Sequence, residues 1–177
     1  IEYIVNHAQN RFIFIDTSFV PVIANVLDKL PLLEGLIVMT DEEHMTDDMR
    51  ELGIPVYCYE ELLATEGSDF VWPLFSADTA SSLCYTSGTT GNPKGVLYSH
   101  GSNINHAMVT VHGDMFNLCA RDSFLLIVPM FHVNGWGLPF SVPMVGGKLV
   151  LPGPHMDGKS LYDLIQAENC NKTCGVP

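Results

Sequence analysis

Residues 86–95 combine the residue types that bind a polyphosphate. This segment holds four hydroxyl side chains, three glycines and one lysine. Glycine permits positive φ and lets backbone N–H groups approach an anion, hydroxyls bind phosphate oxygens or Mg²⁺, and lysine adds positive charge. A flexible linker has a similar composition, but linkers are rarely followed so closely by a lysine and an apolar strand. The segment therefore predicts a phosphate-binding loop.

The spacing within this loop is not that of a Walker A motif. A Walker A loop has four residues between its first glycine and a Gly-Lys-Ser/Thr sequence. Here Gly88 and Gly91 precede Lys94, which follows Pro93 directly. Proline disfavours helical backbone at the residue before it, close to where a Walker helix would begin. We therefore expect a phosphate loop of a different class.

A second segment, residues 129–136, places His132 and Trp136 among apolar residues and a glycine. A single histidine between apolar residues is often a hydrogen-bonded core residue, and a tryptophan beside glycines is often a packing residue. Residue types alone favour these structural interpretations. Three other histidines lie six residues apart and share no helical face at i,i+4 spacing, so no role is assigned to them: His100, His106 and His112.

The composition is that of a globular protein with an uneven charge distribution. Of 177 residues, 47% are hydrophobic and 16% charged, which excludes disorder, collagen and coiled coil. The net charge of −12 argues against binding nucleic acid. Residues 1–80 hold fifteen acidic and three basic residues, whereas residues 81–177 hold five of each. We therefore expect residues 1–80 to form an acidic scaffold and residues 81–177 to hold the anion site.

The apolar pattern predicts an α/β fold with a largely parallel sheet flanked by helices. Apolar runs indicate strands at residues 12–15, 36–39, 56–59, 81–85, 96–98, 124–128 and 148–151. Helices are expected at residues 1–7, 18–30, 60–65, from 99 onward and 160–168. Ser18 is the expected cap of the second helix, with Pro21 in its first turn. Residues 41–51 are expected to be a solvated loop or exposed helix, and residues 66–80 a polar loop.

The five cysteines are odd in number and have no second Cys/His pair at zinc-site spacing, so free structural thiols are expected. No apolar run reaches the length of about 20 residues that spans a bilayer. The chain opens within a predicted helix and ends on a sequence typical of the entry to another element. We therefore expect a piece of a longer protein.

Residues 85–96, YTSGTTGNPKGV, resemble the phosphate-loop signature of the AMP-forming adenylating enzymes. This superfamily comprises acyl-CoA synthetases, peptide-synthetase adenylation domains and beetle luciferases. Residues 129–136, PMFHVNGW, resemble the acyl-site motif of its fatty acyl-CoA synthetase branch, and residues 149–154 and 175–177 also look like that branch. The resemblance covers the whole chain and implies part of the large N-terminal domain of an adenylate-forming enzyme.

The resemblance implies a two-step ligase that uses ATP, Mg²⁺ and CoA. A carboxylate attacks the α-phosphate of ATP to give an acyl-adenylate and pyrophosphate, and the CoA thiol then displaces AMP. By position, Thr86 would hold Mg²⁺, and Lys94 would add positive charge at the leaving pyrophosphate; an exposed lysine at a loop end is the alternative for Lys94. The residues that would fold over the β- and γ-phosphates are Ser87, Gly88, Thr89, Thr90 and Gly91.

The acyl-site motif carries over in the same way. His132 would border the adenylate and the carboxyl group of the acid. Val133 and Trp136 would line the acyl site, and the Trp136 indole would gate the acyl tunnel instead of forming part of the core.

The resemblance also implies partners and missing parts. The glutamate that binds Mg²⁺, the ribose-binding aspartate and the lysine of a C-terminal domain are expected outside residues 1–177, so this piece alone is expected to be inactive. Expected partners are a fatty acid and CoA, with no nucleic acid and no transmembrane segment. A cytoplasmic location is expected, and a homodimer and attachment to a membrane surface stay open. Two alternatives also stay open: a ligase for a short or aromatic acid, and a non-catalytic nucleotide-binding module.

Overall fold

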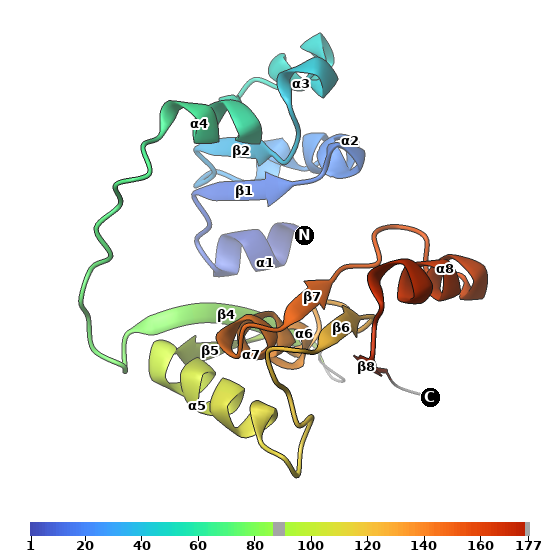
Figure 1. Cartoon of the computed structure of the whole chain (residues 1–177). Coiled ribbons are helices and arrows are strands. Elements are labelled where there is room, and N and C mark those ends of the chain that lie inside the picture. Colours follow the sequence, from blue (N-terminus) through green and yellow to red (C-terminus); the bar gives the residue numbers. More distant parts are fainter. Residues whose placement is uncertain (87–90, 176–177) are drawn as a thin grey trace. The chain divides into compact units, whose positions relative to one another are not determined.

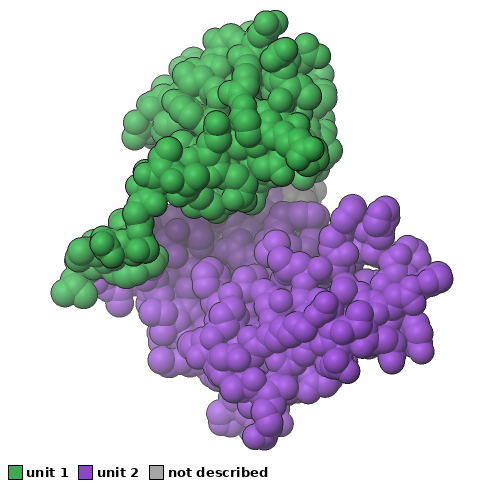
Figure 2. Space-filling view, turned by 45° about the horizontal axis from the view of Figure 1, so that its top comes forward, with its two compact units in different colours: residues 1–74 green, residues 75–177 purple. Residues whose placement is uncertain are grey.

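A computed structural model describes residues 1–86 and 91–175 of the chain (Figure 1). The chain forms two compact units, residues 1–74 and residues 75–177 (Figure 2). The division lies close to residue 80, where the composition changes from acidic to neutral.

The first unit is built on a three-stranded parallel sheet with the order β1-β2-β3. The strands are β1 (Phe12–Ile15), β2 (Gly35–Val38) and β3 (Val56–Cys58), close to the predicted positions. Every residue of the central strand β2 is buried, as its unbroken apolar run predicts. The α-helices of the first unit are α1 (Glu2–His7), α2 (Val20–Ala24), α3 (Asp47–Arg50) and α4 (Tyr59–Thr65). Its short 3₁₀ helices are η1 (Thr17–Phe19), η2 (Leu27–Lys29) and η3 (Glu42–His44).

The prediction of one long helix at residues 18–30 is wrong, because the chain here forms three short elements, η1, α2 and η2. Ser18 does not cap a helix: Asp16 caps η1, with its Oδ1 accepting a hydrogen bond from the Ser18 backbone N–H at 2.9 Å, and α2 has no side-chain cap. Pro21 does lie in the first turn of α2, as predicted. The Asn25 amide donates to the Pro21 carbonyl at 2.9 Å, and such local side-chain bonds compete with continuation of a helix.

The second unit begins with an antiparallel hairpin of β4 (Ala80–Thr86) and β5 (Lys94–Ser99). The seven residues between these strands are too few for a parallel crossover, which needs a dozen or more, so the pair is antiparallel. Helix α5 (His100–Val111) follows, and the Ser99 hydroxyl caps it by accepting from the Ser102 N–H at 3.1 Å. The predicted helix start at residue 99 is thereby confirmed.

The rest of the second unit contains a second parallel sheet, with the order β7-β6-β8. Its strands are β6 (Ser123–Leu126), β7 (Lys148–Val150) and β8 (Lys172–Cys174). The helical elements are α6 (Val133–Trp136), α7 (Leu138–Met144) and α8 (Gly158–Glu168). Two parallel sheets with helices confirm the predicted α/β class, although the chain divides its strands among separate sheets.

The core of the second unit centres on β6, and we call it the β6 cluster. Its buried members are Leu118, Phe124, Leu126, Val128, Leu138 and Val142. Phe124, Leu138 and Val142 have no exposed surface. The cluster joins the central strand to α7 and therefore fixes the helix that follows the acyl-site motif.

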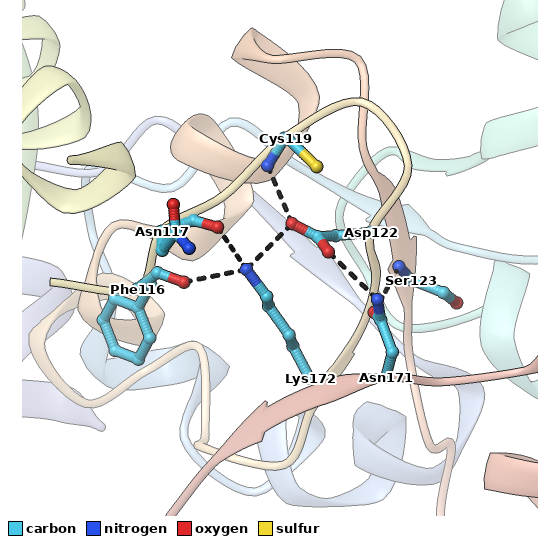
Figure 3. A network of polar contacts seen from close by, with 7 residues as sticks. All are labelled: Phe116, Asn117, Cys119, Asp122, Ser123, Asn171 and Lys172. Carbon is cyan, nitrogen blue, oxygen red and sulfur yellow. Dashed lines mark hydrogen bonds and ion pairs between the residues drawn. The ribbon is translucent and has the colours of Figure 1, made fainter. Parts of the chain in front are cut away.

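Strand β8 is attached to β6 by a buried polar network, shown in Figure 3. The Asp122 carboxylate, only 6% exposed, accepts from Lys172 Nζ at 2.9 Å, from Asn171 Nδ2 at 3.0 Å and from the Cys119 N–H at 2.7 Å. Burial by itself raises the pKa of Asp122, but these hydrogen bonds outweigh it and lower the pKa to about 2. Lys172 Nζ also donates to two backbone carbonyls, those of Phe116 and Asn117.

The five cysteines are all free thiols, as expected from their number and spacing. Among the helices in the described part of the chain, none combines the length and apolar character needed to cross a membrane.

Candidate functional site

The hairpin places Thr86 and Lys94 directly opposite each other, at the end that leads into the predicted phosphate loop. Residues directly opposite in an antiparallel pair project their side chains from the same face, with Cβ atoms about 5 Å apart. Both side chains are exposed. The Thr86 hydroxyl and the Lys94 ammonium group are thus both available to a ligand where the strands enter the loop.

The loop between the strands is described only in part. Ser87, Gly88, Thr89 and Thr90, predicted to fold over the phosphates, lie outside the described residues. Gly91 has a φ of +98° and open space around its Cα, in agreement with the positive φ expected of a loop glycine.

Lys94 keeps its charge available for an anion. Three of the five basic residues in positions 81–177 pair with carboxylates, namely Lys148 with Glu168, Lys159 with Asp163 and Lys172 with Asp122. Lys94 forms no ion pair with any other residue that the structure describes. This exposure fits a phosphate ligand, and it equally fits the exposed loop-end lysine considered from the sequence.

Gly95 belongs to strand β5 and not to the loop. It pairs with Tyr85, and a Cβ at this position would lie 2.9 Å from Leu83 Cδ1 and 3.4 Å from the Tyr85 ring. A larger residue would push these side chains away from the hairpin. Of the three glycines counted in the segment, this one therefore serves strand packing and not anion binding.

The acyl-site motif contains a left-handed turn, which we define as residues 133–137. The φ values are +43° at Val133, +46° at Asn134, +61° at Gly135, +56° at Trp136 and +71° at Gly137. Left-handed backbone costs roughly 1–2 kcal/mol for each residue other than glycine, and it is especially unfavourable for a β-branched valine. The element α6 is therefore a strained single turn that its surroundings must hold.

The predicted residues of this motif have different environments. His132 is exposed, and its backbone N–H donates to the Pro129 carbonyl at 3.0 Å. Val133 is 49% exposed. Trp136 is partly buried and packs against the β6 cluster. The indole thus belongs partly to the core, contrary to that part of the expectation, while its action as a gate stays a prediction.

The structure brings the two motifs together on strand β4. Asn134 Nδ2 donates to Ser82 Oγ at 3.4 Å, and Cys84 Sγ contacts the Phe131 carbonyl oxygen at 3.9 Å. Thr86 lies only two residues beyond Cys84 on the same strand. The left-handed turn is therefore docked on the strand that leads into the phosphate loop.

A pocket of about 240 Å³ lies beside this contact. It is lined by residues of β5, α5, the left-handed turn and α7, including Asn103, His106 and Phe140. A second pocket of about 350 Å³ adjoins α5 and α7 and is lined largely by apolar residues. Sequence reasoning missed the α5 wall, because the spacing of its histidines gives no functional signal.

The acidic residues of the first unit form no comparable site. The one group of potential metal ligands among the described residues is Glu42, Cys58 and Glu61. Glu42 pairs with Arg50, and the Cys58 thiol donates to the Thr40 carbonyl at 3.1 Å, so two of the three already have partners.

A sequence model of the AMP-binding enzyme family matches residues 1–177, the whole chain. The chain belongs to this family. The two segments on which the resemblance to the family depends, residues 85–96 and 129–136, are the two that meet on β4.

Several curated proteins are similar to this chain along its full length. A medium-chain-fatty-acid–CoA ligase of Ectopseudomonas oleovorans is 46% identical over 177 residues, which are 100% of this chain and 32% of the relative. A 3-methylmercaptopropionyl-CoA ligase of Ruegeria lacuscaerulensis is 43% identical, with 99% and 32% covered. A long-chain-fatty-acid–CoA ligase of Thermus thermophilus is 37% identical, with 100% and 30% covered. The chain spans about a third of the length of these curated relatives.

Solved structures share the fold. The anthranilate CoA ligase AuaEII in complex with anthranoyl-AMP superposes with a TM-score of 0.77 at 19% identity, covering 97% of this chain and 32% of that one. The N-terminal domain of FACL13 from Mycobacterium tuberculosis gives a TM-score of 0.76 at 24% identity, covering 99% and 40%. These likenesses confirm that the fold is that of the N-terminal domain of adenylate-forming enzymes.

Proposed function

We propose that the full-length protein is an AMP-forming acyl-CoA ligase that activates a fatty acid with ATP and transfers it to CoA. The observation that carries this proposal is the docking of the acyl-site motif on β4, the strand that ends at Thr86. Membership of the AMP-binding family and the similarity to CoA ligases support it. In a non-catalytic nucleotide-binding module, the contact of the acyl-site motif with the β4–β5 hairpin would have no function.

The proposed reaction has two balanced steps. A carboxylate oxygen of the acid forms a bond to the α-phosphorus of ATP while the bond to pyrophosphate breaks. The thiol sulfur of CoA then bonds to the acyl carbon, the bond to AMP breaks, and the thiol proton is released. In such chemistry the protein chiefly positions the reactants and stabilises charge. Lys94, which is exposed, is proposed to stabilise the leaving pyrophosphate.

Thr86 is the proposed protein ligand of Mg²⁺. Mg²⁺ is commonly held by few protein groups together with water and substrate phosphates, so one exposed hydroxyl at the mouth of a phosphate loop fits this ion. Mg²⁺ bound there would neutralise phosphate charge. The residues Ser87, Gly88, Thr89, Thr90 and Gly91 are proposed to surround the same phosphates through their backbone N–H groups.

The acid is proposed to lie against the left-handed turn. His132 would face its carboxyl group, Val133 would line the acyl site and Trp136 would gate it. The substrate class proposed first is a medium-chain fatty acid, because the medium-chain ligase is 46% identical and the long-chain ligase 37%. A short acid is the second candidate, favoured by the 43% identity to a 3-methylmercaptopropionyl-CoA ligase.

Residues 1–80 are proposed to act as a scaffold outside the chemistry, since both motifs lie in residues 81–177. A cytoplasmic location, membrane attachment and a homodimer remain predictions of the family resemblance.

The decisive experiment is acid-dependent exchange of pyrophosphate into ATP by the full-length protein. We expect exchange only when a carboxylic acid is present, strongest with octanoate in a panel that includes hexadecanoate, propionate and benzoate. Strongest exchange with propionate would replace the first substrate class by the second, and strongest exchange with benzoate would indicate an aromatic acid. Absence of exchange with every acid would contradict the proposed function.

A further inference from the structure

The left-handed turn is held by side chains of neighbouring elements at both ends. At its start, the Asn134 amide donates to Ser82 on β4. At its end, Gly137 lies against the imidazole of His106 on α5. Because the turn is unfavourable for the chain by itself, it depends on these contacts, together with the packing of Trp136 and the hydrogen bonds that the Gly137 carbonyl accepts from Phe140 and Ser141 of α7.

The contact at Gly137 is unusually close. A Cβ at this position would lie 2.4 Å from His106 Nδ1 and 2.7 Å from Cε1, so either the ring or the turn would have to move to admit it. Gly137 also has a φ of +71°, which favours glycine on its own account. The backbone of the turn thus approaches α5 as far as the absence of a side chain allows.

The imidazole also has a polar neighbour on its own helix. The Thr110 hydroxyl, on a residue that is 3% exposed, lies 3.4 Å from His106 Nδ1 and donates to the His106 carbonyl at 2.7 Å. The ring therefore lies between a buried hydroxyl on its own helix and the backbone of Gly137.

That pocket connects the contact to the acid site. Its lining includes His106 together with Val133, Asn134 and Gly137, so both ends of the turn and the ring that supports it face one cavity of about 240 Å³. Trp136, between them, faces the β6 cluster instead. The shape of this pocket wall is consequently set by how closely the turn approaches His106.

We infer that His106 and Gly137 form a positioning pair that fixes the left-handed turn and, with it, the wall of the pocket that meets the acyl group. This inference rests on the proposed function for the identity of the ligand. His106 acts through the turn and is a positioning residue, not a catalytic one. The pair therefore governs how the acid binds and leaves ATP binding at the hairpin unchanged.

The test compares two glycine substitutions in the full-length protein. Gly137→Ala introduces both backbone strain and the collision with His106, whereas Gly153→Ala introduces similar strain, at a φ of +66°, with nothing within 4 Å. We expect Gly137→Ala to raise the KM for octanoate about tenfold or more, since small misplacements near a reacting group are costly. The KM for ATP should stay within about twofold, as should both constants of Gly153→Ala.

A second-site variant separates the pair from a general loss of structure. His106→Ala removes the ring, so the double variant Gly137→Ala/His106→Ala should recover part of the affinity for octanoate. A double variant no better than Gly137→Ala, or a Gly137→Ala protein that matches Gly153→Ala, would overturn the inference.

Amide hydrogen exchange tests the His106–Gly137 pair independently of enzyme activity. Peptides covering residues 130–140 should exchange faster in Gly137→Ala than in Gly137→Ala/His106→Ala, which has the same backbone strain without the collision, while peptides covering residues 80–86 should not change. A wild-type protein that activates no acid would refute the proposed function alone, and these exchange rates would still decide on the pair. Equal rates in both variants would contradict it.

Discussion

The β4–β5 hairpin and the left-handed turn hold the two motifs of the site by opposite means. The hairpin is a regular ladder in which Thr86 faces Lys94 and both side chains are free to meet a ligand. The turn has five successive residues in left-handed backbone and depends on Ser82 and His106 to stay in place. The hairpin is positioned by its backbone ladder, whereas the turn combines local backbone hydrogen bonds with side-chain contacts to neighbouring elements.

This difference has a consequence for what each region can determine. Where the backbone ladder fixes position, a side chain can be replaced without moving its neighbours, so a substitution removes one chemical group and little else. Where packing fixes position, a substitution moves the neighbouring groups as well. The hairpin should therefore govern the rate of the reaction with ATP, and the turn should govern the choice of acid.

The largest effect is expected at Thr86. In the full-length enzyme, Thr86→Ala should slow adenylate formation by roughly 10²–10³, the usual cost of one preorganised transition-state contact. Lys94→Ala should cost less, about tenfold, because solvent can replace part of an exposed charge. Single-turnover formation of the acyl-adenylate measures both. Thr79→Ala, an exposed threonine just before β4, is the matched control and should behave like wild type. A Thr86→Ala rate equal to that of wild type would remove this hydroxyl from the site.

The next effect concerns stability, and it should leave both motifs untouched. Lys172→Met leaves the buried Asp122 carboxylate without its cation and should lower the free energy of unfolding by about 3 kcal/mol, near the lower end for a broken buried pair because Lys172 is partly exposed. Lys159→Met removes an exposed pair and should cost less than about 1 kcal/mol. Denaturant unfolding of the two variants provides the comparison, and equal losses would show that the network of Figure 3 contributes nothing special.

The same network predicts a dependence on pH. The pKa of Asp122 is lowered in the folded protein to about 2, from about 3.9 in an unfolded chain. Its contribution is therefore complete above the unfolded pKa and is lost as the pH falls through the folded value. Asp122→Asn should reduce the slope of stability against pH between about 4 and 2. An unchanged slope would count against the lowered pKa.

A smaller loss of stability than that of Lys172→Met is expected at Trp136. Because the indole packs partly against the β6 cluster, Trp136→Ala should cost about 2 kcal/mol of stability, below the range for a fully buried tryptophan. If the indole also gates the acyl site, the KM should change more for hexadecanoate than for butyrate. Thermal melts and kinetics on a chain-length series separate the two. A lowered melting temperature with an unaltered chain-length profile would leave Trp136 as a core residue only.

The sequence predicted the two strands of the hairpin and the chemistry of its loop, but it did not predict the left-handed turn. Strands such as β2 and β6 are apolar runs, which a local sequence pattern predicts. The hydroxyl and glycine residues of the loop likewise indicate phosphate binding by their composition alone. The turn is decided by contacts between residues far apart in the chain, such as His106 with Gly137, which no local pattern records. Strand β8 was missed for the same reason, because it is short and polar and is held by Lys172 and Asn171.

The central claim is that the acid attacks the α-phosphate of ATP. The most direct measurement follows the oxygen atoms when the full-length protein is given octanoate labelled with ¹⁸O in its carboxylate, together with ATP and CoA. Attack at the α-phosphorus and later cleavage of the acyl–oxygen bond by CoA must leave one labelled oxygen on AMP. Labelled AMP is the result that this account predicts. Label in inorganic phosphate with release of ADP, or no labelled nucleotide at all, would contradict it.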